Sequence, residues 1–210
     1  MGLTISYRGN LKSAKLLPDL IDEIVDIVKI YNWKYDIFEK EYPDNKFYEE
    51  SFDDAYGVIF SPPKCEPVYL TFLSDGKMAN PFFLKYYKED KEESKERTYW
   101  VSTKTQYAGI EVHKVIIQLF RYISKKYLVD FEMSDEGRYW ETNDVQVLQE
   151  SFDRYNFIMD QFAEALDSFT KKENDKNDPE SMINKLIDYL KNKFGDQGFD
   201  IKIISPDNPE

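Results

Sequence analysis

Apolar residues recur along this chain with two different periods, and the switching between them sets the order of its elements. Residues 17–31, 108–127 and 143–169 carry apolar side chains every three or four positions, as on one face of a helix. Between these stretches the pattern changes to short apolar runs bounded by turn residues, which is typical of strands. Strands are expected at seven places: 3–7, 33–38, 56–60, 68–73, 78–86, 98–102 and 128–133.

This order of elements predicts an α+β fold. We expect a mixed, largely antiparallel sheet with a central β-meander flanked by β-α-β units, and helices packed on the sheet. Asp75-Gly76 between two apolar runs indicates a hairpin, because both positions tolerate a positive φ. Thr142 or Asn143 is expected to cap the helix that follows.

The length of 210 residues favours one domain with an appended element. The chain contains 3 Trp, 16 Tyr and 15 Phe, which is too aromatic for a disordered acidic chain. We expect a single α+β domain over residues 1–169. A linker rich in Lys, Asn and Asp follows over 170–178, and a C-terminal helix with a short strand and tail over 179–210.

Charge and composition exclude several classes of function. With 40 acidic against 28 basic residues the net charge is −12, which argues against a nucleic-acid partner because duplex binding needs clustered Lys and Arg. No stretch approaches the ~20 apolar residues that a membrane span needs. A single cysteine, Cys65, fits a reducing compartment, and we expect the protein to be cytoplasmic. No metal spacing or glycine-rich phosphate loop is present, so we expect neither metal nor cofactor.

Hydroxyl, amide and lysine side chains follow the strand expected at 98–102, just before a helix. A helix N-terminus offers free N–H groups and a partial positive charge, so it can hold an anion. An alternative is that these side chains only cap the helix. The candidate ligand-binding residues are Ser102, Thr103, Lys104, Thr105 and Gln106.

A second polar stretch, residues 134–141, lies between a strand and a helix. Asp135 and Glu136 could act as carboxylates in acid/base chemistry, and Arg138 could contact a ligand. Alternatively, the stretch forms a turn with aromatic anchors over the start of the helix. Candidate interface residues here are Tyr139, Trp140 and Glu141.

These two stretches are expected to lie close together. Residues 98–133 look like a β-α-β crossover, so the two strands would be parallel and both stretches would leave their carboxyl ends at one edge. His113, the only histidine, lies at the boundary of the helical stripe, just over a turn from the start of the helix. It could serve as an acid/base with Asp135 and Glu136, or it could simply be packed.

Three segments resemble a group of small acidic bacterial proteins of unassigned function: WVSTKTQYAG at 100–109 with His113, SDEGRYWET at 134–142, and PVYLTF at 67–72 with Asp75-Gly76. The resemblance covers roughly residues 1–169. It implies a bacterial, cytoplasmic origin and assigns no activity, cofactor or site residue.

Three functions remain open on this basis. The first is a protein-binding module, of the immunity or regulatory/adaptor type, that binds a basic protein through an acidic aromatic surface as a monomer or homodimer. The second is a small-molecule or anion-binding protein, or an enzyme, with a pocket formed by residues 102–107 and 134–141. The third is a structural subunit that docks through the 179–194 helix.

Overall fold

The computed structural model describes residues 2–84 and 99–172, together with 184–185, 188–189 and 192. The chain divides into two compact units, residues 1–155 and 156–210. Helix α6 (Val145–Lys172) begins in the first unit and continues into the second. The features analysed below lie in the first unit.

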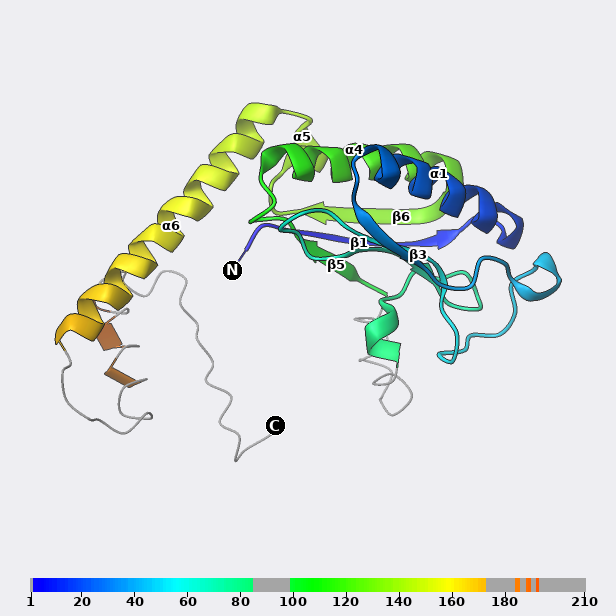
Figure 1. Cartoon of the computed structure of the whole chain (residues 1–210), viewed down its shortest axis with the longest axis horizontal. Helices are drawn as coiled ribbons and strands as arrows, with labels where there is room; N and C mark the ends of the chain where they lie inside the picture. The colour runs from blue at the N-terminus through cyan, green and yellow to red at the C-terminus, as the bar shows by residue number, and fades with distance from the viewer. Residues whose placement is uncertain (1, 85–98, 173–183, 186–187, 190–191, 193–210) are drawn as a thin grey trace. The chain divides into compact units, whose positions relative to one another are not determined.

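Six strands in the described part of the chain form two antiparallel ladders of three strands each (Figure 1). The first ladder has the order β5-β1-β6, and the second has the order β2-β3-β4. The strands are β1 (Thr4–Leu11), β2 (Lys34–Ile37), β3 (Tyr56–Ser61), β4 (Val68–Phe72), β5 (Val101–Lys104) and β6 (Leu128–Asp135).

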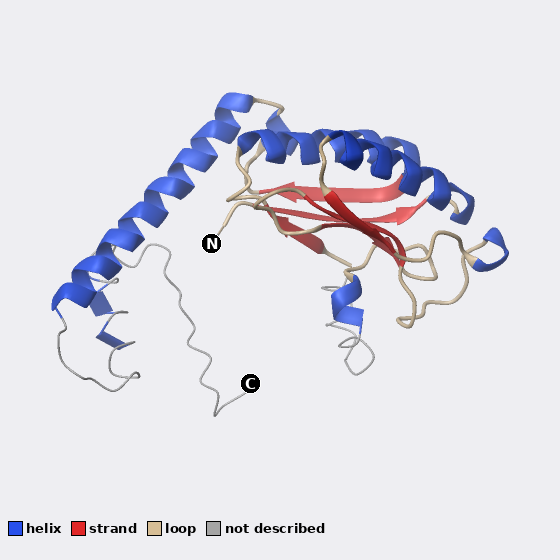
Figure 2. Ribbon diagram, viewed as in Figure 1, coloured by secondary structure: helices blue, strands red, loops and turns tan. Residues whose placement is uncertain are grey.

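Two long helices lie side by side over one face of the strands (Figure 2). Helix α1 (Leu17–Ile30) packs on β3 of the second ladder, and α4 (Ile110–Tyr127) packs on β6 of the first. Each buries a stripe of apolar residues at helical spacing, which is the reason these segments form helices here. The shorter turns are η1 (Ala14–Leu16), η2 (Pro43–Asn45), η3 (Pro81–Phe83) and the single-turn helix α5 (Tyr139–Thr142).

Several hydrogen bonds join the two ladders, and the buried Tyr7 makes two of them. Tyr7 lies on the buried face of β1, and its hydroxyl donates to the carbonyl of Tyr69 (3.1 Å) and accepts from the N–H of the same residue (3.0 Å). Since Tyr69 belongs to β4, this phenol occupies the place that a neighbouring strand would take. An isolated bridge between Asn10 and Lys77 makes a further link between the two ladders.

The α+β fold class is confirmed, and most predicted elements are present within a few residues of their expected bounds. The strand predicted at 78–86 is wrong over its described part: after a single bridge from Met78 to Phe72, the chain enters η3. Pro81 cannot donate to a ladder, and the side chain of Asn80 accepts from the N–H of Phe82 (3.0 Å), which caps the turn instead. Residues 85–86 lie outside the described residues.

The start and end of α6 also differ from expectation. Its first turn is capped by Asp144, whose carboxylate accepts from the N–H of Gln146 (2.7 Å), rather than by Thr142 or Asn143. The helix continues to Lys172, into the linker predicted at 170–178. The rest of that linker, the strand predicted at 199–204 and most of the helix predicted at 179–194 lie outside the described residues.

Replacing the junction tyrosine, Tyr7→Phe, should lower the free energy of unfolding by about 1–3 kcal/mol, because it leaves the buried N–H and C=O of Tyr69 without a partner. Urea unfolding should show a lower midpoint with an unchanged slope. Tyr35→Phe is the matched control, since Tyr35 is only half buried. Equal midpoints for the two variants would contradict this role for the hydroxyl.

Candidate functional site

Residues 102–107 and 134–141 do leave the same edge of one ladder. Ser6 of β1 lies opposite Ser102 of β5 on one side and Ser134 of β6 on the other. Because β1 is antiparallel to both neighbours, β5 and β6 run in the same direction, as the predicted crossover requires. β1 lies between them, so the two stretches are separated by the width of one strand.

A buried hydrogen-bonded network connects the two stretches through α4. The His113 ring is fully buried, with Nδ1 2.7 Å from the Thr105 hydroxyl and Nε2 3.1 Å from an oxygen of Asp135. A carboxylate only accepts hydrogen bonds, so Nε2 carries a hydrogen. The Thr105 hydroxyl can donate to Nδ1 or accept from it, because the carbonyl of Leu3 lies within its reach (3.2 Å).

Asp135 also accepts hydrogen bonds from the backbone. Its two oxygens accept from the N–H groups of Gly137 (2.7 Å), Tyr139 (2.8 Å) and Trp140 (3.0 Å), which fixes the turn that leads into α5. Burial alone would raise the pKa of Asp135, but the hydrogen bond and charge interaction with His113, together with the backbone donors, outweigh it. The pKa of this carboxyl is therefore held below its usual value.

The network is closed to solvent. Gly137 packs so tightly that an added Cβ would lie 2.7 Å from Leu148 and 2.8 Å from the His113 ring. Phe152 of α6 packs edge-on against the same ring, with centroids 5.8 Å apart. Both ring nitrogens are engaged and no face of His113 is exposed, so the arrangement suits a structural lock better than acid/base chemistry on a substrate.

The remaining predicted ligand-binding and catalytic residues do not gather around His113. Ser102 and Lys104 lie exposed on strand β5, while Thr103 is buried and its hydroxyl donates to the carbonyl of Pro67 (3.0 Å). The exposed Glu136 accepts from the backbone N–H of Thr4 (2.7 Å). Two further candidates behave differently: Gln106 has a buried side-chain oxygen without a partner among the described residues, and Arg138 is exposed with a positive φ.

The predicted interface residues are mostly anchors. Tyr139 is buried, and its hydroxyl accepts from Gln118 (3.1 Å). Trp140 is half buried against Phe131. The Arg121 guanidinium donates to the backbone carbonyls of Tyr139 and Trp140. Because Tyr139 is buried, it cannot contact a partner. The alternative interpretation, a turn with aromatic anchors, therefore describes residues 134–141 better. Of the three candidates, Glu141 is the exposed one.

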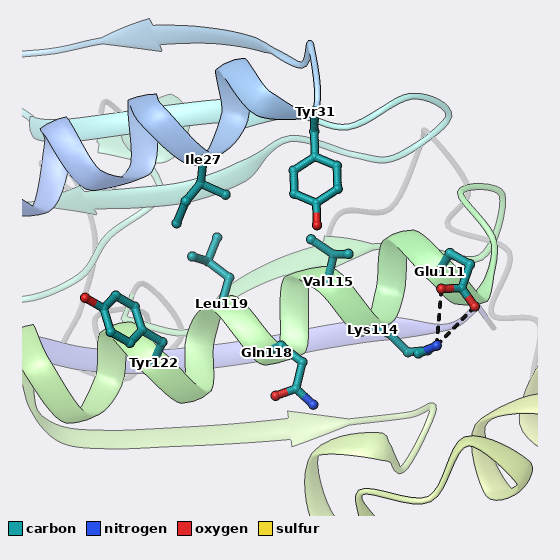
Figure 3. Close-up of a pocket in the computed structure, with 8 residues that line it drawn as sticks. All are labelled: Ile27, Tyr31, Glu111, Lys114, Val115, Gln118, Leu119 and Tyr122. Carbon is teal, nitrogen blue, oxygen red and sulfur yellow. Dashed lines mark hydrogen bonds and ion pairs between the residues drawn. The ribbon is translucent and has the colours of Figure 1, made fainter.

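An open groove between α1 and α4 is the surface feature that the sequence did not reveal (Figure 3). It has a volume of about 400 Å³ and mostly apolar walls. Ile27 and Tyr31 of α1 point toward Val115 and Leu119 of α4. The remaining lining residues all come from α4: Glu111, Lys114, Gln118 and Tyr122.

One end of the α1–α4 groove is held by a polar clasp between the helices. The Tyr122 hydroxyl donates to Glu23 (3.0 Å), and the Lys126 ammonium pairs with the same carboxylate. Burial would raise the pKa of Glu23, but the hydrogen bonds from Lys126 and Tyr122 outweigh this and lower it. At the other end Tyr31 stacks on Trp33, with ring centroids 4.8 Å apart.

A second cavity, of about 270 Å³, lies on the opposite face of β1. Most of its charged side chains are already paired. Arg8 makes two contacts with Glu132 (2.7 and 2.9 Å), Lys77 pairs with Asp75 just outside the lining (2.9 Å), and Asp130 accepts from the Asn10 amide (3.4 Å). A cavity whose charges are paired in this way offers less to a ligand than the open apolar groove.

Comparisons with known proteins find no match: no protein-family model matches the chain, and no curated protein or solved structure is detectably similar to it. Among the described residues, no group of three or more His, Cys, Asp or Glu side chains is placed to hold a metal ion. Nor does any helix in that part of the chain have the length and apolar character to cross a bilayer.

The lowered pKa of Asp135 predicts how the free energy of unfolding depends on pH in acid. A group whose folded pKa is lowered stabilises the fold above its unfolded pKa, about 3.9, and loses that contribution as the pH falls through the folded pKa. Asp135→Asn should therefore cost about 3 kcal/mol at pH 7, as expected when a buried hydrogen-bonded carboxylate is removed, and progressively less as the pH falls below about 4.

Urea unfolding at several pH values checks this, with the exposed neighbour Glu136→Gln as control. The control should stay within about 0.5 kcal/mol of the natural chain at pH 7. A constant gap between Asp135→Asn and the natural chain down to pH 2 would show that the charge of Asp135 contributes nothing.

Proposed function

We propose that this protein is a protein-binding module and that the α1–α4 groove is its docking surface for a basic partner protein. The observation that carries this is an open apolar groove with two half-exposed tyrosines, Tyr31 (47% exposed) and Tyr122 (48%). Ile30, beside Tyr31 at the end of α1, is 81% exposed. Contiguous exposed apolar patches of this kind mark interaction sites, and aromatic side chains supply much of the energy at such sites.

Charge supports a basic partner. The chain has a net charge of −12, and the exposed face of α1 carries three carboxylates, Asp19, Asp22 and Asp26. None of these three forms an ion pair within the part of the chain that the structure describes. Acidic surfaces steer basic partners to the site and speed their association. We name these three carboxylates the α1 acidic edge.

The proposal keeps the acidic aromatic surface expected from the sequence but moves it from residues 139–141 to the two helices. We propose further that the protein is bacterial and cytoplasmic, and that it is of the immunity or regulatory/adaptor type. The resemblance favours the bacterial origin, and the single cysteine favours the cytoplasm. The small-molecule or anion-binding alternative has less support, because its proposed acid/base, His113, is buried with both ring nitrogens engaged.

Tyr31→Ala should abolish capture of the partner. Removing a central aromatic anchor typically weakens binding by 2 kcal/mol or more, which is about thirtyfold. The tagged full chain and the variant would be used to capture proteins from a bacterial lysate at low salt, with mass spectrometry as the readout. We expect a basic protein that the natural chain retains and Tyr31→Ala loses.

Tyr107→Ala is the matched control, since Tyr107 is 65% exposed but does not line the groove. It should retain the partner. A partner captured equally by Tyr31→Ala would place the binding surface elsewhere, and the absence of any retained basic protein would count against the binding-module function.

A further inference from the structure

The two helices that form the α1–α4 groove run antiparallel. Glu23 of α1 contacts Tyr122 and Lys126, which are late in α4, whereas Tyr31 at the end of α1 lines the groove with Glu111, which is early in α4 (Figure 3). A groove between two packed helices presents the ridges and hollows into which a third helix packs. Its shape therefore favours a helical occupant.

The length of the apolar floor sets how much of a helix it can hold. From Val115 to Tyr122 the floor spans seven residues of α4, which is two helical turns or about 10 Å. A partner helix of the same length presents three or four apolar side chains along one face, at i, i+3 or i+4, and i+7.

The two sides of the groove carry different charge. On the α4 side, Glu111 and Lys114 pair with each other (3.1 Å) and cancel. On the α1 side lies the α1 acidic edge, and its Asp22 and Asp26 are one turn apart, where like charges repel. None of these carboxylates lines the groove itself: Asp26 lies alongside it, between the levels of Glu23 and Tyr31, and Asp19 lies one turn beyond Glu23, past the Tyr122 end.

The aromatic wall of the groove is held in place before binding. Tyr31 stacks on Trp33, and Trp33 stacks on the buried Phe60 with centroids 5.9 Å apart. A side chain that is already fixed loses little conformational freedom when a partner packs on it. Tyr31 is thus suited to contact an apolar residue of the incoming helix.

We infer that the occupant of the α1–α4 groove is an amphipathic helix of a partner protein, with two turns of apolar side chains on the groove floor and Lys or Arg side chains along the α1 acidic edge. This inference rests on the proposed function and deepens it. Basic residues at i and i+7, on the flank next to α1, would face Asp19 and Asp26.

The test uses the full chain and a labelled synthetic peptide as the probe, read by fluorescence anisotropy. The peptide is about 18 residues long, because shorter isolated helices are marginal, and carries leucines at i, i+3/i+4 and i+7 with lysines on one flank. Asp19→Asn with Asp26→Asn should weaken binding about fivefold at 50 mM salt, and this difference should shrink as salt is raised. Asp36→Asn with Glu41→Gln is the matched control, because it removes the same two charges at exposed positions that do not line the groove, and it should not weaken binding.

Two control peptides test the helix itself. A peptide of the same composition with a scrambled order, and one with a central proline, should each bind at least tenfold more weakly than the probe. Equal binding of either peptide would overturn a helical occupant. Binding of the probe that survives Tyr31→Ala would place it outside the groove and would also overturn the inference.

Failure of this inference and failure of the proposed function give different results. If the peptide does not bind but a basic protein is still captured in a Tyr31-dependent way, the groove takes a non-helical partner. If the natural chain instead self-associates in sedimentation and Tyr31→Ala does not, the occupant is a second copy of the chain. Both results would overturn the inference of a helical occupant. Only the second would also contradict the basic partner protein of the proposed function.

Discussion

The hydroxyl of Tyr7 does for this protein what a run of backbone hydrogen bonds does in a continuous sheet. It pairs with both backbone groups of Tyr69 and, together with the hydrogen bonds of Thr103 to Pro67 and of Glu66 to Lys104, holds the β5-β1-β6 ladder against the β2-β3-β4 ladder. Each ladder carries one of the two long helices, α1 on β3 and α4 on β6. The α1–α4 groove therefore lies between two helices that pack on different ladders.

The His113 network shows how a set of residues typical of catalysis can serve to hold a fold. Thr105, His113 and Asp135 come from the end of β5, from α4 and from the end of β6, so their hydrogen bonds join three elements at one point. The same residues would be a plausible site if they were open to solvent. Leu148 and Phe152 of α6 and the close approach of Gly137 close them off.

The sequence predicted local structure well and long-range structure only in part. Periodicity located α1, α4 and most strands, and the crossover geometry correctly implied that β5 and β6 are parallel. It could not show that β1 lies between them, because that pairing joins Ser6 to residues 102 and 134. Pro81 already argues against a strand at 78–86, because it has no N–H to donate to a ladder. The Asn80 side chain accepts from the N–H of Phe82 and so stabilises a turn there instead.

The candidate site was harder to predict for the same reason. Tyr31, Val115 and Leu119 fitted the apolar stripes of their helices and so resembled core residues. Leu119 is indeed part of the core, but all three also line the groove. Ile27 and Ile30 fell off the stripe of α1, which was the one local sign of an apolar face outside the core. A groove between two helices depends on which helices become neighbours, and the pattern of either helix alone does not contain that information.

The central position of β1 also bears on how the protein is made. β1 precedes its partners β5 and β6 by roughly 90 to 130 residues. The β2-β3-β4 ladder uses nearby segments and can form while the chain is still growing, with α1 available to cover it. The first ladder, by contrast, cannot close until β6 has been made, so the apolar face of β1 stays without its strand partners until then.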